Sequence, residues 1–509
     1  MREISLPNQW IEAALDDVVD NIVGGGTPSK AIPSYFQGNI PWMTVKDMNK
    51  FVLDDTVDHI SEEAANNSAT NIIPAGTPII ATRMSLGKLV RAKFDSAINQ
   101  DLKAIFLNEN ISKIYFEYWY RSISQKIQEM GTGTTVKGIR LEDIKQLSFL
   151  VAPLAEQQQI AQKLDELLAQ VDILKTRLDA IPNILKRFRQ SVLAAAVSGR
   201  LTEEWRENQV FNIDSEIENI KAQREISFNE ISDGQFIKTG KRPRSFDFST
   251  LNEVPPERDI PSEWKLLQMG EIISFLTDYH ANGSYEVLKE NVELKDSEDY
   301  ACMIRATNFE KNNFSDLMIY ISESAYHFME KSKLYGGEIL IGKIGNAGSV
   351  YLMPYLNKPA SLAMNLFALR FPEPLINSKY IYFFLKSRFG ESNIQSYVRG
   401  VATKSIDKIS IRSIFINLPP LEEQTEIVRR VEQLFAYADQ IEQRVKDAQA
   451  RVNYLTQSIL AKAFRGELTA DWRAQNPELI SGENSAAALL ERIKAERMLS
   501  SKKSKAKKG

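Results

Sequence analysis

The chain has 509 residues, a net charge of −3 and one cysteine, Cys302. This length is too great for one hydrophobic core and predicts several domains, and the balanced charge means that a polyanionic partner would meet local basic patches. The single cysteine excludes an intrachain disulfide and cysteine-rich zinc sites and favours a reducing, cytoplasmic location, and the three histidines have no metal-ligand spacing. No charged-then-apolar leader follows Met1 and no apolar run could cross a bilayer, so we predict no membrane attachment.

Residues 1–152 open with turns and then show strand patterns. Residues 77–94 (TPIIATRMSLGKLVRAKF) alternate like a β-hairpin with its tip at Ser85–Gly87. The aromatic run 114–120 (IYFEYWY) could stack unpaired bases. Its spacing favours a helix packed into the module instead.

Residues 153–206 predict a long helix. From Ile160 to Val192 an apolar residue recurs at steps of four and three, which is typical of a coiled coil. This stretch would rise by about 48 Å. Pro153 and Gly199 suit a helix start and a left-handed C-cap, and Pro182 predicts a kink rather than a break.

The same order then returns. Residues 338–353 (EILIGKIGNAGSVYLM) predict a second hairpin with its tip at Gly345–Gly348, residues 380–385 (YIYFFL) a second aromatic helix, and residues 427–459 a second coiled-coil helix. The predicted boundaries are a first module at 1–152, a helical spacer at 153–206, a polar, partly ordered linker at 207–258, a second module at 259–419, a second spacer at 420–476, and a C-terminal segment at 477–509 that ends in a basic disordered tail.

The helical segments are an internal repeat. SVLAAAVSGRLTEEWR (191–206) matches SILAKAFRGELTADWR (458–473), and APLAEQQQI (152–160) matches PPLEEQTEI (419–427). A weaker match joins LPNQW (6–10) to IPSEW (260–264). We place the linker and the basic end, residues 500–509, outside the repeat. The predicted fold is α+β, with two α/β modules separated by two long antiparallel coiled-coil helices in a pseudo-two-fold repeat. In the alternative, each helix packs only on its own module.

Sites for catalysis are missing from the sequence. Gly336–Ile344 contains G-x-x-x-x-G-K, but Ile344 stands where a phosphate loop needs Ser or Thr. No triad or carboxylate pair has a defensible spacing. We therefore predict that the chain is not an enzyme.

The module order, the helix starts PLAEQQQI and PPLEEQTEI, and the helix ends SGRLTEEWR and RGELTADWR resemble the DNA-specificity subunits of type I restriction–modification systems, especially the enteric adenine-methylating subgroup. The resemblance implies that each module is a target-recognition domain reading one half of a bipartite site on double-stranded DNA. It also implies that the helices set the gap and dock two methyltransferase subunits, which restriction subunits that translocate DNA then join. S-adenosylmethionine would lie in the methyltransferase, and ATP and Mg²⁺ in the restriction partner, so this chain would hold no cofactor. An autonomous coiled-coil DNA-binding regulator and, more distantly, a protein-binding scaffold remain alternatives.

The hairpins are candidate readers of DNA, because the major groove admits a two-stranded ribbon and Arg, Lys and Asn recognise base edges there. Lysines kept in both loops before the long helices suit phosphate contacts, which position DNA without specifying its sequence. The alternative for each residue is a solvated turn position. The candidates are Arg83, Lys88, Lys343 and Asn346 at the tips, Thr44, Lys46, Arg305 and Thr307 in an upstream pair of segments, and Lys137 and Lys404 in the loops.

Overall fold

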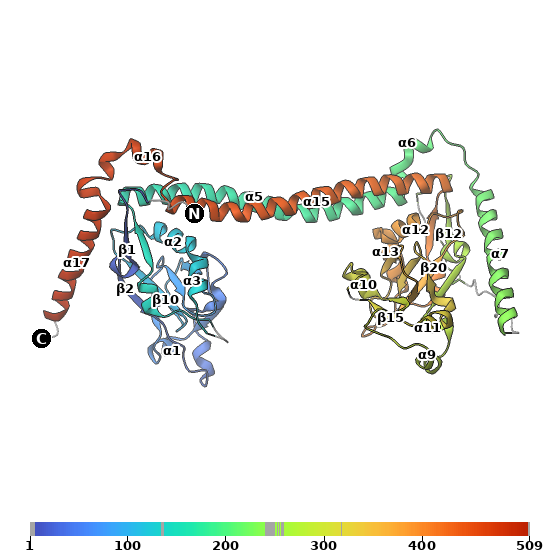
Figure 1. Cartoon of the computed structure of the whole chain (residues 1–509), viewed down its shortest axis with the longest axis horizontal. Helices are drawn as coiled ribbons and strands as arrows, with labels where there is room; N and C mark the ends of the chain where they lie inside the picture. The colour runs from blue at the N-terminus through green and yellow to red at the C-terminus, as the bar shows by residue number, and fades with distance from the viewer. Residues whose placement is uncertain are drawn as a thin grey trace. The chain divides into compact units, whose positions relative to one another are not determined.

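The computed structural model describes residues 6–133, 137–239, 250, 251, 253, 255, 259–316 and 318–506. It divides into two compact units: Met1–Asp179 with Val445–Gly509, and Ala180–Arg444. Each unit therefore combines one globular module with parts of both long helices (Figure 1). Within the described residues, no helix has the length and apolar character required to cross a membrane.

The first module contains three sheets, with strand orders β1-β11, β2-β10-β7-β8-β4 and β5-β3-β9-β6. The strands are β1 (Ile11–Ala14), β2 (Val19–Gly24), β3 (Ile40–Met43), β4 (Val52–Leu53), β5 (Asp58–Ile60), β6 (Asn71–Ile73), β7 (Ile79–Ala81), β8 (Leu89–Ala92), β9 (Ser96–Ile98), β10 (Leu102–Leu107) and β11 (Ser148–Val151), and the helices are α1 (Glu62–Asn66), α2 (Lys113–Ser122), α3 (Ser124–Met130) and α4 (Leu141–Lys145).

The second module repeats this plan, with strand orders β12-β21, β13-β20-β17-β18 and β15-β14-β19-β16. The strands are β12 (Lys265–Gln268), β13 (Phe275–Asp278), β14 (Ala301–Ile304), β15 (Ile319–Ile321), β16 (Lys333–Leu334), β17 (Ile339–Gly342), β18 (Val350–Leu352), β19 (Ala360–Leu362), β20 (Leu366–Arg370) and β21 (Phe415–Leu418), and the helices are α8 (Met269–Ile272), α9 (Tyr285–Asn291), α10 (Ala306–Glu310), α11 (Glu323–Phe328), α12 (Ser378–Lys386), α13 (Arg388–Tyr397) and α14 (Lys408–Ser413).

Both predicted hairpins are present. Strand β7 pairs antiparallel with β8, with Ile79 opposite Val90, and β17 pairs antiparallel with β18, with Ile341 opposite Val350. Each module also has one four-stranded sheet with a single parallel pairing, β3 with β9 in the first module and β14 with β19 in the second. The prediction that the two modules share one scaffold is therefore confirmed.

The aromatic runs form buried helices, as their spacing predicts. In α2, Tyr115, Phe116, Trp119 and Tyr120 are almost fully buried, and in α12 the side chains of Tyr380, Ile381, Phe384 and Leu385 are buried as well. Because these rings fill the interior beside β11 and β21, they are not available for base stacking.

The long helices α5 (Leu154–Val197) and α15 (Leu421–Phe464) run antiparallel inside each unit. In the first unit Lys163 bonds to the carbonyl of Leu468, and Gln449 bonds to Asp179 at 2.7 Å. In the second unit Arg189 contacts Asp439 and Glu442, while Arg430 bonds to the carbonyl of Leu201. In these contacts, increasing residue numbers along α5 meet decreasing residue numbers along α15, so the predicted antiparallel pairing is confirmed. Helix α5 continues unbroken through Pro182.

The helices also pack on the modules, so the two alternatives are combined. Ile160 and Leu164 share a core with Leu460 and with Tyr115 of the first module. In the second unit Val192 and Val431 join a core that includes Tyr380. The heptad pattern is not buried throughout, because Leu174 and Leu455 are 46% and 44% exposed.

The repeat extends further than the sequence prediction placed it. Helix α7 (Ile213–Thr239) follows the short α6 (Glu203–Arg206), and α17 (Ala486–Ala506) follows α16 (Ala470–Gln475). Residues 216–227 (EIENIKAQREIS) and 489–500 (LLERIKAERMLS) align, and the shared isoleucine, at Ile220 and Ile493, is buried in both. The prediction that the linker lies outside the repeat is therefore wrong.

A shared arginine explains the match. Arg224 donates to the carbonyls of Gly270 and Ile273 beside α8, and Arg497 donates to the carbonyl of Asp16 at the equivalent turn. Most of the predicted disordered tail is also helical, since α17 continues to Ala506 and its Ala and Lys residues favour a helix. The basic stretch 238–244 of the linker lies outside the residues whose side chains are described.

Candidate nucleic-acid interface

Each hairpin tip is joined to the loop that precedes the long helix. The N–H of Met84 donates to the carbonyl of Lys137 at 3.1 Å, and the N–H of Gly345 donates to the carbonyl of Lys404 at 3.0 Å. Both donors have a positive φ, 58° for Met84 and 81° for Gly345. The structure thus brings the tip candidates and the loop lysines into one surface in each module.

Of the first tip's side chains, Arg83 is 64% exposed and its guanidinium lies 3.9 Å from Asp101. Lys88 and Lys137 are exposed. Exposed guanidinium and ammonium groups can reach base edges or phosphates. Arg83 would first give up its contact with the buried Asp101.

In the upstream segment of the first module, both candidate side chains already have partners within the protein. Thr44 is buried and caps the short 3-10 helix η3 (Val45–Asp47), accepting from the N–H of Lys46. Lys46 itself bonds to Asp58 at 2.8 Å, and this hydrogen bond raises the pKa of the lysine above its ordinary value. Thr44 therefore serves local structure, while Lys46 keeps an exposed side chain beside a carboxylate.

The lysine of the second tip forms an ion pair inside the module. Lys343 bonds to Asp278 at 2.6 Å, and Lys408 contacts the other oxygen of that carboxylate at 3.0 Å. Burial alone would raise the pKa of Asp278, but the hydrogen bonds from the two lysines hold it below its ordinary value. Lys343 thus starts from a shorter ion pair than Arg83, and its side chain is less exposed.

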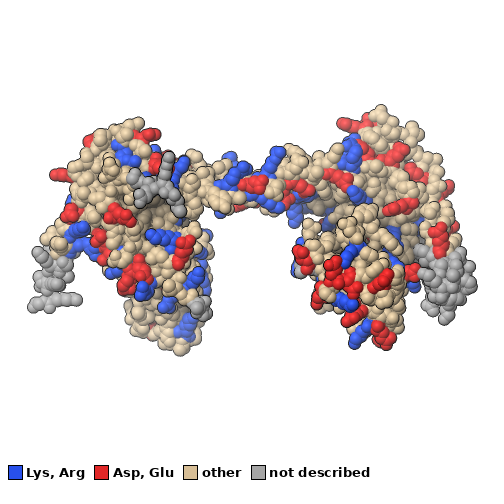
Figure 2. All heavy atoms as spheres, viewed as in Figure 1, with Lys and Arg blue, Asp and Glu red and all other residues tan. Residues whose placement is uncertain are grey.

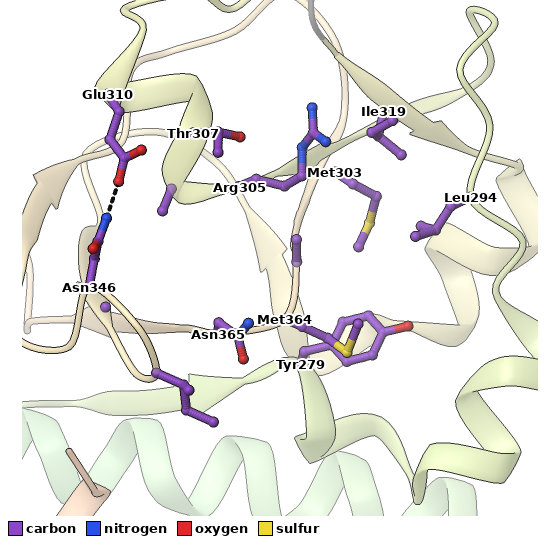
Figure 3. Close-up of a pocket in the computed structure, with 14 residues that line it drawn as sticks. Tyr279, Leu294, Met303, Arg305, Thr307, Glu310, Ile319, Asn346, Met364 and Asn365 are labelled. Atoms are coloured by element: carbon purple, nitrogen blue, oxygen red, sulfur yellow. Dashed lines mark hydrogen bonds between the residues drawn. The ribbon is translucent and has the colours of Figure 1, made fainter. Parts of the chain in front are cut away.

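Three further candidates of the second module line one pocket of about 460 Å³. Arg305, Thr307 and Asn346 lie on its rim, and Asn346 donates to Glu310 (Figure 3). Met303, Ile344 and Met364 add an apolar lining. An apolar floor with amide and guanidinium groups at its edge suits a base edge that carries a methyl group, as thymine does.

Sequence reasoning missed the role of the most strongly repeated residues. Glu156 of α5 is fully buried and accepts from Trp10 at 2.8 Å, from Thr469 at 2.7 Å and from Arg473. In the second unit Glu423 of α15 accepts from Trp264 at 2.8 Å, Thr202 at 2.7 Å and Arg206 at 3.0 Å. The joint recurrence of W, E and LT-x-x-WR in both copies was the signal that could have revealed this.

A glycine completes each of these junctions. Gly466 has a φ of 73°, and a Cβ there would lie 2.3 Å from Pro7, while Gly199 has a φ of 79° and a Cβ there would lie 2.4 Å from Pro261. The predicted left-handed C-caps are confirmed. The networks hold each module against both long helices and leave the hairpin tips outside, so the repeated motifs are architectural.

Within the described residues, no group of His, Cys, Asp and Glu side chains is arranged to hold a metal ion. The exposed chemistry consists of guanidinium, ammonium, amide and hydroxyl groups around the hairpins. Such groups bind and orient, and they match the polar contacts that proteins make with DNA.

The family model for the Type I restriction modification DNA specificity domain matches the chain twice, over residues 7–183 and 261–448. The chain is 33% identical to the Type I restriction enzyme EcoBI specificity subunit of Escherichia coli, over 99% of this chain and 96% of that relative. It is 36% identical to the EcoDI specificity subunit of Escherichia coli, over 90% of this chain and 91% of that relative.

Two solved structures share the fold. One belongs to a study titled "Structural basis underlying complex assembly and conformational transition of the type I R-M system", with 17% identity, a TM-score of 0.58, and coverage of 91% of this chain and 99% of that chain. The other is the HsdS subunit from Thermoanaerobacter tengcongensis, with 18% identity, a TM-score of 0.53, and coverage of 91% and 98%.

A duplicated module with an exposed hairpin, repeated together with its long helix, is the architecture of a protein that confers DNA target recognition. The chain belongs to the family of type I restriction–modification specificity subunits, and its resemblance to the enteric members is confirmed.

Proposed function

We propose that each module reads one half of a bipartite site on double-stranded DNA and that the chain itself catalyses no reaction. The main support for this proposal is that the two modules share a topology but present different side chains at the equivalent hairpin tip. Arg83 and Lys88 stand at the first tip, and Lys343 and Asn346 at the second. A common scaffold with different reading groups recognises two different sequences.

The long helices are the proposed spacer and docking surface. Each is 44 residues long, which corresponds to a rise of about 66 Å. We propose that this length, rather than a base contact, sets the number of unread base pairs between the half-sites.

Large apolar side chains stay exposed along these helices, among them Ile173 at 53%, Tyr437 at 59% and Tyr454 at 78%. Exposed apolar patches mark interaction surfaces. Because the helices are copies of one another, two copies of one partner are the natural occupants, and we propose that these are two methyltransferase subunits.

The proposed assembly divides the chemistry among its subunits. S-adenosylmethionine would be held by the methyltransferase, which methylates adenine, and ATP and Mg²⁺ by the restriction subunits, leaving this chain without a cofactor. The assembly would act in the cytoplasm.

Genome-wide adenine methylation, compared with the gene present and deleted, tests the proposal. We expect one split motif to lose its methylation. Replacing residues 1–132 with those of a relative should change one half of that motif and leave the other half unaltered. Unchanged methylation while the partner genes are expressed would contradict the proposal and favour an autonomous DNA-binding regulator.

A further inference from the structure

A cleft of about 310 Å³ lies in the first unit beside the hairpin tip. Gly87 and Lys88 contribute the end of the hairpin, and Thr456 and Gln457 belong to the last turns of α15. Arg121 and Lys50 complete its basic lining. Three cationic side chains, two hydroxyls and two amides thus line one hollow that the hairpin and a long helix share.

The three cations lack close acidic partners. Across the described part of the chain, no carboxylate lies within ion-pair distance of Lys50, Lys88 or Arg121. Lys50 lowers the pKa of Asp54 and Arg121 opposes the rise in the pKa of Glu117, but both carboxyl groups have other partners. Asp54 bonds to Lys93 at 2.7 Å, and Glu117 is buried beside Arg91. Positive charge in the cleft is therefore available to an anion.

Arg121 is held in place by aromatic rings instead. Its guanidinium carbon lies 4.7 Å from the ring centre of Phe51 and 5.6 Å from that of Tyr118. Stacking of this kind orients the guanidinium plane without neutralising its charge. An arginine fixed in this way loses little side-chain entropy when it donates to an anion.

One cation of the cleft, Lys88, has no equivalent at the aligned position of the second module. The aligned tips place Ser349 where the first hairpin has Lys88, because Gly87 corresponds to Gly348. Figure 2 shows Lys and Arg side chains spread over the first module, whereas Asp and Glu gather on the lower part of the second in the same view.

We propose that this cleft binds phosphates of the DNA backbone next to the first half-site, with Lys50 and Arg121 as contacts that position the duplex without reading its sequence. The inference rests on the proposed DNA-binding function. Lys88 connects the cleft with the proposed reading site, because it lines the cleft and also lies at the hairpin tip. Arginine and lysine supply most phosphate contacts, and each phosphate neutralised steepens the salt dependence of binding.

The test uses the complex of the full chain with its methyltransferase partners and measures the dissociation constant for duplex DNA at several salt concentrations. For Lys50→Gln combined with Arg121→Gln, we expect the slope of log affinity against log salt to become shallower by about 1 to 2, equally on specific and non-specific duplexes. Arg121→Lys should retain most of the slope because it retains the charge. Lys93→Gln is the matched control, because it removes a charge from the same module that Asp54 already neutralises.

An unchanged slope in the double variant, or an equal reduction in Lys93→Gln, would overturn the inference. A loss confined to the specific duplex would also overturn it, since that result would make these residues base readers. A wild-type complex that binds DNA without preferring any motif would contradict the proposed function. It would not contradict the phosphate-binding cleft, because the salt dependence can be measured on a non-specific duplex as well.

Discussion

The indole N–H of Trp10 lies 2.8 Å from a buried carboxylate oxygen of Glu156, although 146 positions separate them in the chain. Trp264 repeats this bond to Glu423 at the same distance. Each glutamate begins one long helix, and its remaining partners come from the segment that ends the other. The buried glutamate in the first turn of each long helix is therefore neutralised only when the end of the other helix is folded against it.

Glu423→Gln should destabilise the protein strongly. The substitution removes the buried carboxylate that pairs with Arg206, whose side chain is only 10% exposed. The more exposed Glu263, 3.9 Å away, is then the remaining counter-charge of a nearly buried cation. Breaking a buried pair in this way costs about 3 to 5 kcal/mol. Thermal and denaturant unfolding measure the loss, and Glu422→Gln, one residue earlier and exposed, is the control. Equal melting temperatures for the two variants would show that the network contributes nothing to stability.

Glu117 should make the stability of the first unit depend on pH. Burial raises the pKa of this carboxyl to about 7, although Arg91 lies 3.8 Å away and opposes the shift. The folded protein keeps the proton that the unfolded chain loses near its ordinary value of 4.5, so stability falls as pH rises from about 4.5 to 7. The fall should reach at most about 3 kcal/mol.

Glu117→Gln should flatten that profile, because the amide does not titrate. Unfolding by urea at pH 5, 6, 7 and 8 measures the effect. The exposed Glu129→Gln variant should retain the wild-type slope. A Glu117→Gln profile as steep as that of the wild type would assign the pH dependence to other groups.

Asn346→Ala should relax specificity at one position of the second half-site. Asn346 stands on the rim of the pocket shown in Figure 3, and an amide that reads a base contributes about 1 to 3 kcal/mol of discrimination. Methylation rates on duplexes that carry each single base change report the effect. Asn291→Ala, on α9 of the same module, is the control. A uniform loss across all sequences would remove Asn346 from the set of base readers.

Trp205→Ala and Trp472→Ala should each remove one methyltransferase subunit from the complex. These tryptophans occupy equivalent positions in the two copies and are only partly buried, and exposed tryptophans frequently anchor protein interfaces. Native mass spectrometry distinguishes two bound partners from one, and Tyr285→Ala, an aromatic residue that is 59% exposed on α9, is the control. Two partners on both tryptophan variants would show that α6 and α16 contribute nothing to the docking surface proposed on the long helices.

Local patterns in the sequence predicted the elements well. Heptad spacing predicted α5 and α15, alternation predicted the β7–β8 and β17–β18 hairpins, and aromatic spacing predicted the buried helices α2 and α12. Each of these signals depends on neighbours a few residues apart, for which helix and strand geometry is fixed.

The sequence did not predict contacts between residues that are far apart in the chain. Asp278 is 65 positions from Lys343, and nothing near either residue indicates their ion pair. Thr44 was selected for its place in an alignment, but its hydroxyl caps η3. The match between α7 and α17 was readable as I-K-A-x-R in both copies, although only Arg224 and Arg497 at equivalent turns explain why it persists.

The agreement of α7 with α17 has an evolutionary consequence. A repeat that includes module, long helix and following helix leaves little of the described chain outside one ancestral protomer. Such a protomer would have lacked the opposite helix end that its own Glu156 or Glu423 requires, and a second identical protomer supplies that end. The present protein is therefore best understood as a fused homodimer, in which one gene for two halves allowed the target of each half to diverge alone.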